Sequence, residues 1–246
     1  MSEGKVTIKT ADGNCDCYTY TAPGDAPAPA IILYMDGIGI RPDLRAMAQR
    51  LASNGYFVLL PNLYYRAGEY APFDLASMLT NEAERNRMMA LVQSVTNAGT
   101  MRDTAAFLDF LSHEPGVKGS KIGCVGYCMG GPLVLTAAGT FPDRVAAGAS
   151  IHGANLANDR PDSPHLLAPK MRGKIYVAIA EIDPWLTPGE MDRLKAALET
   201  AKTNFTMEVY PGVQHGFAAN GTPMYDRAAA ERHWERILAL FRETLS

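Results

Sequence analysis

The chain has 246 residues, of which 47% are hydrophobic and 20% are charged, and its formal net charge is −3. This length and apolar content are ample for one sizeable core, so we expect residues 1–246 to form a single domain. The small negative charge gives no reason to expect a nucleic acid or an anionic membrane as a partner.

The N-terminal sequence Met-Ser-Glu-Gly-Lys-Val lacks the apolar core of a signal peptide. No apolar run approaches the roughly 20 residues that are needed to span a bilayer. We therefore expect a cytoplasmic protein with no membrane partner.

A β-hairpin is predicted over residues 6–21, because β-rich flanks surround an Asp12-Gly13 turn. Cys15 and Cys17 lie two residues apart on the second strand, so they face the same side. With no His or Cys cluster nearby, we expect free thiols and no disulfide or metal pair. Because N-terminal hairpins are often exposed, we expect both thiols to be accessible to alkylation.

Strands and helices then alternate in the pattern of a parallel sheet. The apolar run at 30–35 predicts a buried strand, a glycine-rich loop follows at 36–40, and a helix opens near Pro42. The next strand is expected at 56–60. Residues 62–100 interrupt this rhythm, and we interpret them as an active-site excursion with one or two helices.

The rest of the chain repeats the strand–helix alternation. This predicts an α/β fold with a mostly parallel central sheet, helices on both faces and a ligand site beyond the carboxyl ends of the strands. We expect strands at 122–125, 145–151, 174–180 and 205–210, helices at 101–111, 132–138, 188–201 and 223–244, and a loop at 161–169.

A nucleophile-elbow pattern, G-x-C-x-G, follows the strand that ends near Val125. In such an elbow the central residue, here Cys128, is strained, so its neighbours must be small. The helix that follows would favour a thiolate at its N-terminus. The backbone N–H of Met129 would point to the same place and could stabilise an oxyanion.

Asp183 and His215 also follow predicted strands, so the chain order is nucleophile, acid, histidine. That is the order found in α/β-hydrolases. His215 would carry the thiol proton and Asp183 would orient the imidazole. Each residue alone also fits a structural role, and it is their joint occurrence that favours catalysis. His152 is a rival histidine, but it precedes the acid and fits a pocket-lining role better.

The whole chain resembles the dienelactone hydrolase family. The resemblance rests on the Gly126–Gly131 elbow, on the strand ending at Asp183 and on the Gly212–Phe217 stretch around His215. It implies an α/β-hydrolase domain that cleaves small carboxylic esters or lactones through a cysteine acyl-enzyme. It also implies no metal and no organic cofactor. A carboxylesterase without lactone preference, or a catalytically silent binding protein, are the alternatives.

Two departures from the family concern the substrate pocket. Asp36 stands where the family has a glutamate that partners the resting thiol, and it is either that partner or a loop acid that binds nearby amides. The N–H of Gly37 would be the second oxyanion donor. Ala219 lies where dienelactone-specific members have a carboxylate-binding arginine. The family's second carboxylate-binding arginine could correspond to Arg85 or Arg87, although a salt bridge on the helix surface is the better interpretation of either. His152 and Trp185 are further candidates for contact with the substrate or the thiol.

Overall fold

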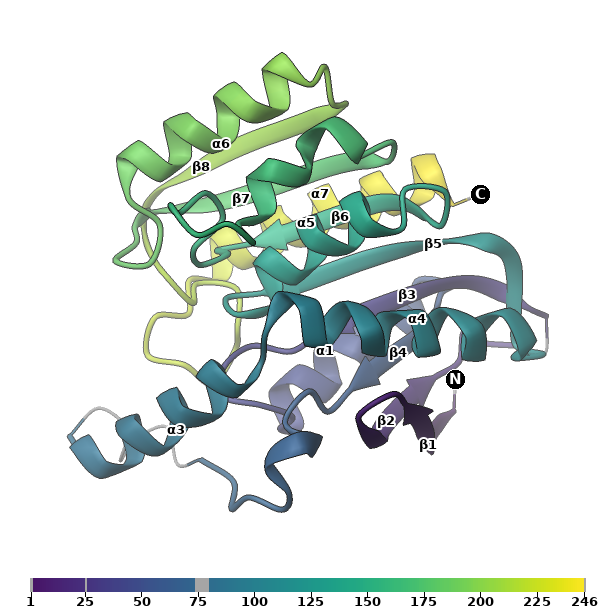
Figure 1. Cartoon of the computed structure of the whole chain (residues 1–246). Helices are drawn as coiled ribbons and strands as arrows, with labels where there is room; N and C mark the ends of the chain where they lie inside the picture. The colour runs from purple at the N-terminus through teal and green to yellow at the C-terminus, as the bar shows by residue number, and fades with distance from the viewer. Residues whose placement is uncertain (1, 25, 74–79, 246) are drawn as a thin grey trace.

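The centre of the molecule is one eight-stranded sheet, seen in the computed structural model, which describes residues 2–24, 26–73 and 80–245 (Figure 1). The strand order is β1-β2-β4-β3-β5-β6-β7-β8. The strands are β1 (Glu3–Thr10), β2 (Gly13–Tyr20), β3 (Ala28–Tyr34), β4 (Phe57–Pro61), β5 (Val117–Tyr127), β6 (Val145–Ile151), β7 (Lys174–Ile182) and β8 (Phe205–Gln214).

The sheet is mostly parallel, as the sequence predicts. β1 and β2 form the expected N-terminal hairpin, and β2 joins β4 antiparallel. All the strand pairs from β4 to β8 are parallel. The predicted α/β-hydrolase fold class is therefore confirmed.

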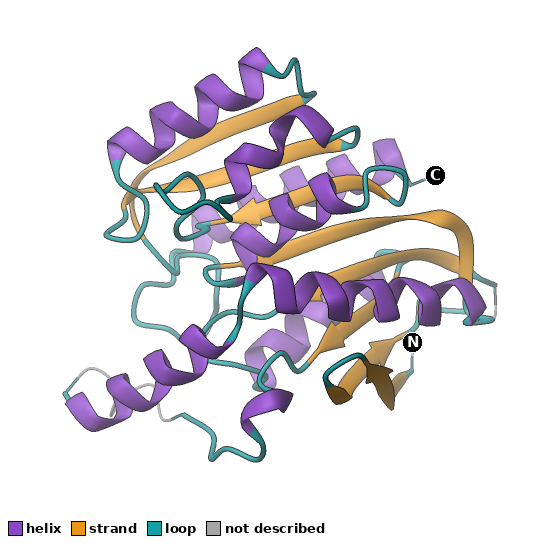
Figure 2. Ribbon diagram, in the orientation of Figure 1, coloured by secondary structure: helices purple, strands orange, loops and turns teal. Residues whose placement is uncertain are grey.

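Helices cover both faces of this sheet (Figure 2). In Figure 1, α4 and α5 lie in front of the strands, and α1 and α7 lie behind them. The helices are α1 (Pro42–Ser53), α3 (Glu82–Ser94), α4 (Asn97–His113), α5 (Gly130–Thr140), α6 (Pro188–Thr200) and α7 (Arg227–Thr244), with short 3-10 helices η1 (Tyr65–Ala67) and η2 (Pro164–Lys170). No helix in the described ranges is both long and apolar enough to cross a membrane.

Strand register brings the ends of the three central strands together. Tyr34 of β3 pairs with Gly126 of β5, and Gly126 pairs with Ser150 of β6. The strands are buried on both faces, as their continuous apolar runs predict. The residues two positions beyond these paired ones, Asp36, Cys128 and His152, must therefore meet at one edge of the sheet.

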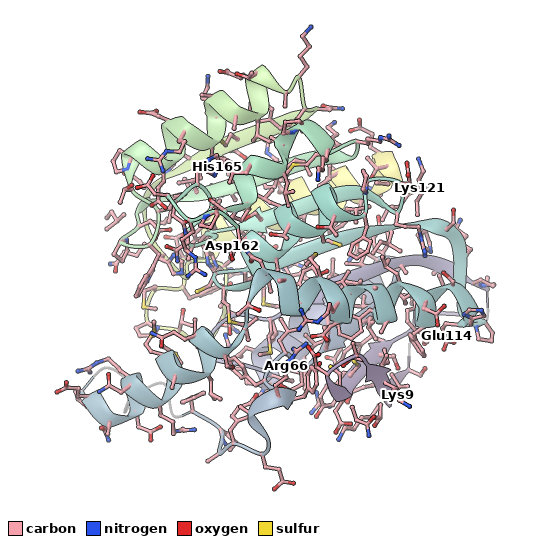
Figure 3. The ribbon with its side chains drawn as sticks, viewed as in Figure 1. Lys9, Arg66, Glu114, Lys121, Asp162 and His165 are labelled. Atoms are coloured by element: carbon pink, nitrogen blue, oxygen red, sulfur yellow. The ribbon has the colours of Figure 1, made fainter. Side chains whose placement is uncertain are left out.

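The predicted excursion holds η1, α3 and the first turn of α4. Arg66 of η1 (Figure 3) anchors its start, because the guanidinium binds Asp12 of the hairpin turn at 2.7 Å and Asp103 of α4 at 2.8 Å. None of the residues of α3 is buried, and the helix projects from the body of the molecule in Figure 1. Residues 74–79 of the excursion lie outside the described residues.

Several predicted boundaries differ from the structure. α4 begins at Asn97, not at 101, because the Thr96 hydroxyl accepts from the Gly99 N–H and caps an extra turn. The predicted loop at 161–169 contains η2. β8 continues past Pro211 to Gln214, which an edge strand allows.

The predicted accessibility of two cysteines is also wrong. Cys15 and Cys17 are fully buried, although they are free thiols as expected. They lie on the face of the hairpin that packs into the main apolar core. The hairpin is therefore an integral part of the fold and not an exposed appendage.

Candidate active site

A sharp turn between β5 and α5 presents Cys128. Its φ is 52°, a left-handed backbone conformation that is uncommon for residues other than glycine. A Cβ at Gly126 would lie 2.2 Å from the carbonyl oxygen of Gly130, and a Cβ at Gly130 would lie 2.4 Å from the carbonyl oxygen of Tyr34. The glycines of the elbow are thus required by close backbone packing, as the sequence pattern predicts.

Cys128 is the one cysteine that is not buried. Its backbone is held from both sides, because its N–H donates to the Ile151 carbonyl at 3.1 Å and its carbonyl accepts from the Ala154 N–H at 3.2 Å. Cys124 lies four residues earlier, within β5, and is fully buried. Burial raises the pKa of its thiol to about 12. Cys124 in β5 is therefore shielded from reagents, whereas Cys128, directly after β5, is accessible to them.

Asp183 and His215 are brought together by adjacent strands β7 and β8. Nδ1 of His215 lies 2.9 and 2.8 Å from the two carboxylate oxygens of Asp183. The Asp183 carboxylate also accepts from the Trp185 N–H at 2.8 Å. Since the Asp183 side chain is only 2% exposed, this carboxylate is held in one orientation toward the imidazole.

The other ring nitrogen of His215, Nε2, is buried and has no well-formed hydrogen bond within the described residues. His215 and Cys128 line the same cavity. Burial alone would lower the pKa of His215, but its hydrogen bonds to Asp183 and the nearby Cys128 and Asp183 groups raise it to about 10. The environment of His215 therefore favours an imidazolium at neutral pH, which is the form that stabilises a neighbouring thiolate.

Two backbone amides at this edge are available to an oxyanion. No hydrogen bond engages the N–H of Gly37 or of Met129 within the described part of the chain. The Tyr64 hydroxyl links their two segments, because it donates to the Gly37 carbonyl at 2.7 Å and lies 3.7 Å from the Met129 sulfur. Both segments border the cavity that Cys128 reaches.

Asp36 is engaged by its own loop. Its carboxylate accepts two hydrogen bonds from the Arg41 guanidinium, at 2.7 and 2.8 Å, and one from the Ile38 N–H at 3.0 Å. Both charged side chains are nearly buried. Among the described residues, no hydrogen bond joins Asp36 to Cys128. The structure thus provides the local amide contact expected of a loop acid, and an arginine partner that sequence reasoning missed.

The cavity above Cys128 has a volume of about 520 Å³ and a largely apolar lining. Helix α3 and the turn after it supply one wall, through Met88, Met89, Val92 and Val95. These residues recur at helical spacing, so an apolar stripe on one face of this helix was readable from the sequence. Pockets of this kind bind small organic molecules and use a few polar groups to orient them.

Arg85 and Arg87 do not border this cavity in the described part of the chain. Arg87 is bound to Glu84 at 2.7 Å and stacks on the ring of Phe73, and Arg85 is likewise absent from the lining. Arg160, which sequence reasoning missed, lines the rim, and its Nε donates to Asp162 (Figure 3) at 3.0 Å. Arg87 therefore forms the kind of helix-surface salt bridge that the sequence favoured for it, while the face of α3 that reaches the cavity carries methionine and valine.

Trp185 and His152 do line the cavity. Trp185 follows Asp183 and is 45% exposed, so it stands at the rim. His152 follows β6 and is 1% exposed, and its ring centroid lies 5.0 Å from that of His215. Its predicted pocket-lining position is confirmed. No group of three or more His, Cys, Asp or Glu side chains in the described ranges is arranged to hold a metal ion.

A histidine–aspartate pair beside a thiol at a strand-to-helix elbow, above a sheet of this order, defines an α/β-hydrolase fold. The model of the dienelactone hydrolase family matches residues 16–245, and the chain therefore belongs to that family. It is accordingly a hydrolase.

Individual relatives agree with this assignment. The chain is 26% identical over 243 residues to a protein of Methylorubrum extorquens described as "Putative carboxymethylenebutenolidase", covering 98% of this chain and 80% of the relative. A protein of Synechocystis with the same description is 26% identical over 220 residues, which is 88% of this chain and 87% of the relative. Among solved structures, the "Putative Dienelactone Hydrolase" of Klebsiella pneumoniae has a TM-score of 0.83 at 23% identity, covering 98% of both chains.

Proposed function

We propose that this hydrolase cleaves small carboxylic esters or lactones through a Cys128–His215–Asp183 triad. The observation that carries the proposal is the left-handed Cys128 at the elbow, in one cavity with a histidine whose other nitrogen is fixed by a buried aspartate. The dienelactone hydrolase family and the lactone-cleaving activity in its relatives' descriptions support the substrate class.

In the proposed mechanism the Cys128 thiolate attacks the ester carbonyl carbon. The oxyanion that forms would be stabilised by the N–H groups of Gly37 and Met129. His215 then donates its proton to the departing alkoxide oxygen, which leaves an acyl thioester on Cys128. In the second half, His215 accepts a proton from water, the hydroxide attacks the thioester, and the acid and the thiolate are released.

Asp183 would keep Nδ1 of His215 protonated and stabilise the imidazolium. Trp185 and Met88 would contact the substrate from the rim and from the wall. Apart from the His215 imidazolium beside Cys128, the described lining holds one cation, Arg160. Because Arg160 is already paired with Asp162, the pocket offers a substrate carboxylate little additional charge stabilisation. We therefore favour uncharged esters and lactones over dienelactone itself.

The test compares Cys128→Ala, Cys128→Ser and the matched control Cys124→Ala with the wild type, using short-chain p-nitrophenyl esters and γ-butyrolactone. Hydrolysis should be lost in Cys128→Ala and reduced to a trace in Cys128→Ser, while Cys124→Ala remains active. Acid quenching during turnover should trap an acyl group on the Cys128 peptide, and hydroxylamine should remove it. Full activity of Cys128→Ala would refute the proposed mechanism.

A further inference from the structure

One buried histidine has no hydrogen-bond partner for its ring nitrogens among the described residues. Both ring nitrogens of His152 are buried and make no hydrogen bond in the described part of the chain. The other two buried histidines are satisfied: Nε2 of His233 lies 3.1 Å from the Tyr127 hydroxyl, and Nδ1 of His165 lies 2.8 Å from the Ser163 hydroxyl. Buried polar groups without a partner destabilise the folded state, so each one requires an explanation.

The backbone conformation of His152 is a second feature that destabilises the folded state. Its φ is 37°, in the left-handed region that side-chain-bearing residues seldom adopt. The residue is held there by its N–H, which donates to the Ala178 carbonyl at 2.8 Å. Strain of this kind tends to cluster at ligand sites, where the surrounding structure enforces it.

The position of His152 is at the reacting centre. The segment 151–154 holds the backbone of Cys128 on both sides, and His152 lines the same cavity as Cys128 and His215. Its ring lies edge-on to His215 at 5.0 Å and edge-on to Phe217 at 5.4 Å between centroids. A molecule bound to Cys128 would therefore be close to this imidazole.

The chemistry of the ring restricts what it can recognise. Burial, followed by the positive charges of His215 and Arg41, keeps the pKa of His152 well below its usual value. A neutral imidazole has one N–H donor and one acceptor nitrogen. It therefore suits a hydroxyl or carbonyl oxygen of an uncharged ligand, and it gives a carboxylate no ionic partner.

We propose that His152 is a specificity-determining residue that hydrogen-bonds an oxygen substituent close to the reacting carbonyl of the substrate. The preferred substrates are then esters or lactones of hydroxy- or oxo-substituted acids. This inference rests on the proposed function, because it places the substrate carbonyl at Cys128. It extends that function by naming the group that the pocket selects.

The experiment measures kcat/KM for γ-butyrolactone and for its α-hydroxy and β-hydroxy derivatives. In the wild-type protein, at least one hydroxylactone should exceed the parent lactone by about tenfold or more, since a site built to bond a hydroxyl discriminates against analogues that lack it. In His152→Phe, which keeps a ring but no nitrogen, this ratio should fall to about 1. Thr222→Val is the matched control, because the Thr222 hydroxyl also lies at the cavity but already bonds the Ala219 carbonyl at 3.0 Å. Its ratio should remain that of the wild type.

A binding measurement separates this inference from the proposed function. The Cys128→Ala protein, labelled with ¹⁵N-histidine, is titrated with each lactone and followed by NMR. The ring nitrogens of His152 should shift with the hydroxylactone and much less with the parent lactone, and this readout does not require His152→Phe to fold. Hydrolysis without any hydroxyl preference, or a preference that persists in His152→Phe, would overturn the inference and leave the hydrolase intact. Selective binding without hydrolysis of any lactone or ester would overturn the proposed function instead.

Discussion

Removing the Asp36 carboxylate should cost the protein about 3–5 kcal/mol of unfolding free energy, the usual range for breaking a buried ion pair from one side. In Asp36→Ala, the Arg41 guanidinium loses both charged hydrogen bonds and keeps the Gly39 carbonyl at 3.1 Å and a distant carboxylate, Asp43, at 4.0 Å. Because the Arg41 side chain is only 11% exposed, water replaces the lost partner poorly. The penalty therefore comes mainly from the stranded cation.

Urea denaturation of Asp36→Ala, Arg41→Met and the double variant measures this penalty. If the stranded charge is the cause, the double variant should be more stable than the sum of the single losses predicts, by about 2 kcal/mol or more. Asp162→Ala is the matched control, since its pair with Arg160 is exposed and should be worth about 1 kcal/mol or less. A loss below about 1 kcal/mol in Asp36→Ala, or strictly additive losses, would refute this reasoning.

The same variants separate the two roles that the sequence leaves open for Asp36. Arg41→Met releases the carboxylate from its ion pair without removing it. If Asp36 can partner the thiol, the rate at which iodoacetamide alkylates Cys128 should change in Arg41→Met. An unchanged rate, together with the stability loss in Asp36→Ala, would identify Asp36 as a loop acid alone.

Three further predictions concern the triad and the buried groups around it. Asp183→Asn should keep the fold but lower kcat by about 10³–10⁴, because the amide favours the wrong imidazole tautomer, and near wild-type turnover would exclude Asp183 from the triad. In the native protein, iodoacetamide should label Cys128 alone by peptide mass mapping, since the other three cysteines are buried, and rapid labelling of any of them would contradict the burial described. Burial lowers the pKa of His233 to about 3. Because this pKa is about 6.5 in the unfolded chain, the contribution of His233 to stability is complete above about pH 6.5 and is lost as the pH falls toward 3. Lowering the pH from about 6.5 to about 5 should therefore cost about 2 kcal/mol of unfolding free energy through this residue. Urea denaturation should show this pH dependence reduced in His233→Gln. It should be retained in the control His113→Gln, because the native His113 side chain is 78% exposed.

Much of the fold was predictable because its signals are local. Continuous apolar runs identify the buried parallel strands, and the glycines around Cys128 identify the elbow, since a single turn of backbone requires them. Asp183 and His215 could be paired from strand-end positions alone, because adjacent parallel strands end at the same edge of a sheet.

The remaining features depend on contacts between distant segments, which local patterns do not encode. The burial of Cys15 and Cys17 depends on how the hairpin packs into the core. Arg87 lies outside the cavity because another face of α3 reaches it. The missing hydrogen bonds of the His152 ring nitrogens can be recognised only when all the described neighbours are placed. Sequence patterns therefore located Cys128, Asp183 and His215 better than they located the residues of the cavity wall.

The projecting helix α3 has an evolutionary consequence. It supplies one wall of the cavity, yet it buries none of its residues and stands apart from the sheet. Surface substitutions away from packed features usually change stability by only a few tenths of a kcal/mol. Met88 and Met89 can therefore mutate with little penalty to the fold, whereas the elbow glycines cannot. Relatives with this architecture can therefore change the cavity wall by substitutions on one helix, while the residues at the carboxyl ends of the strands stay the same.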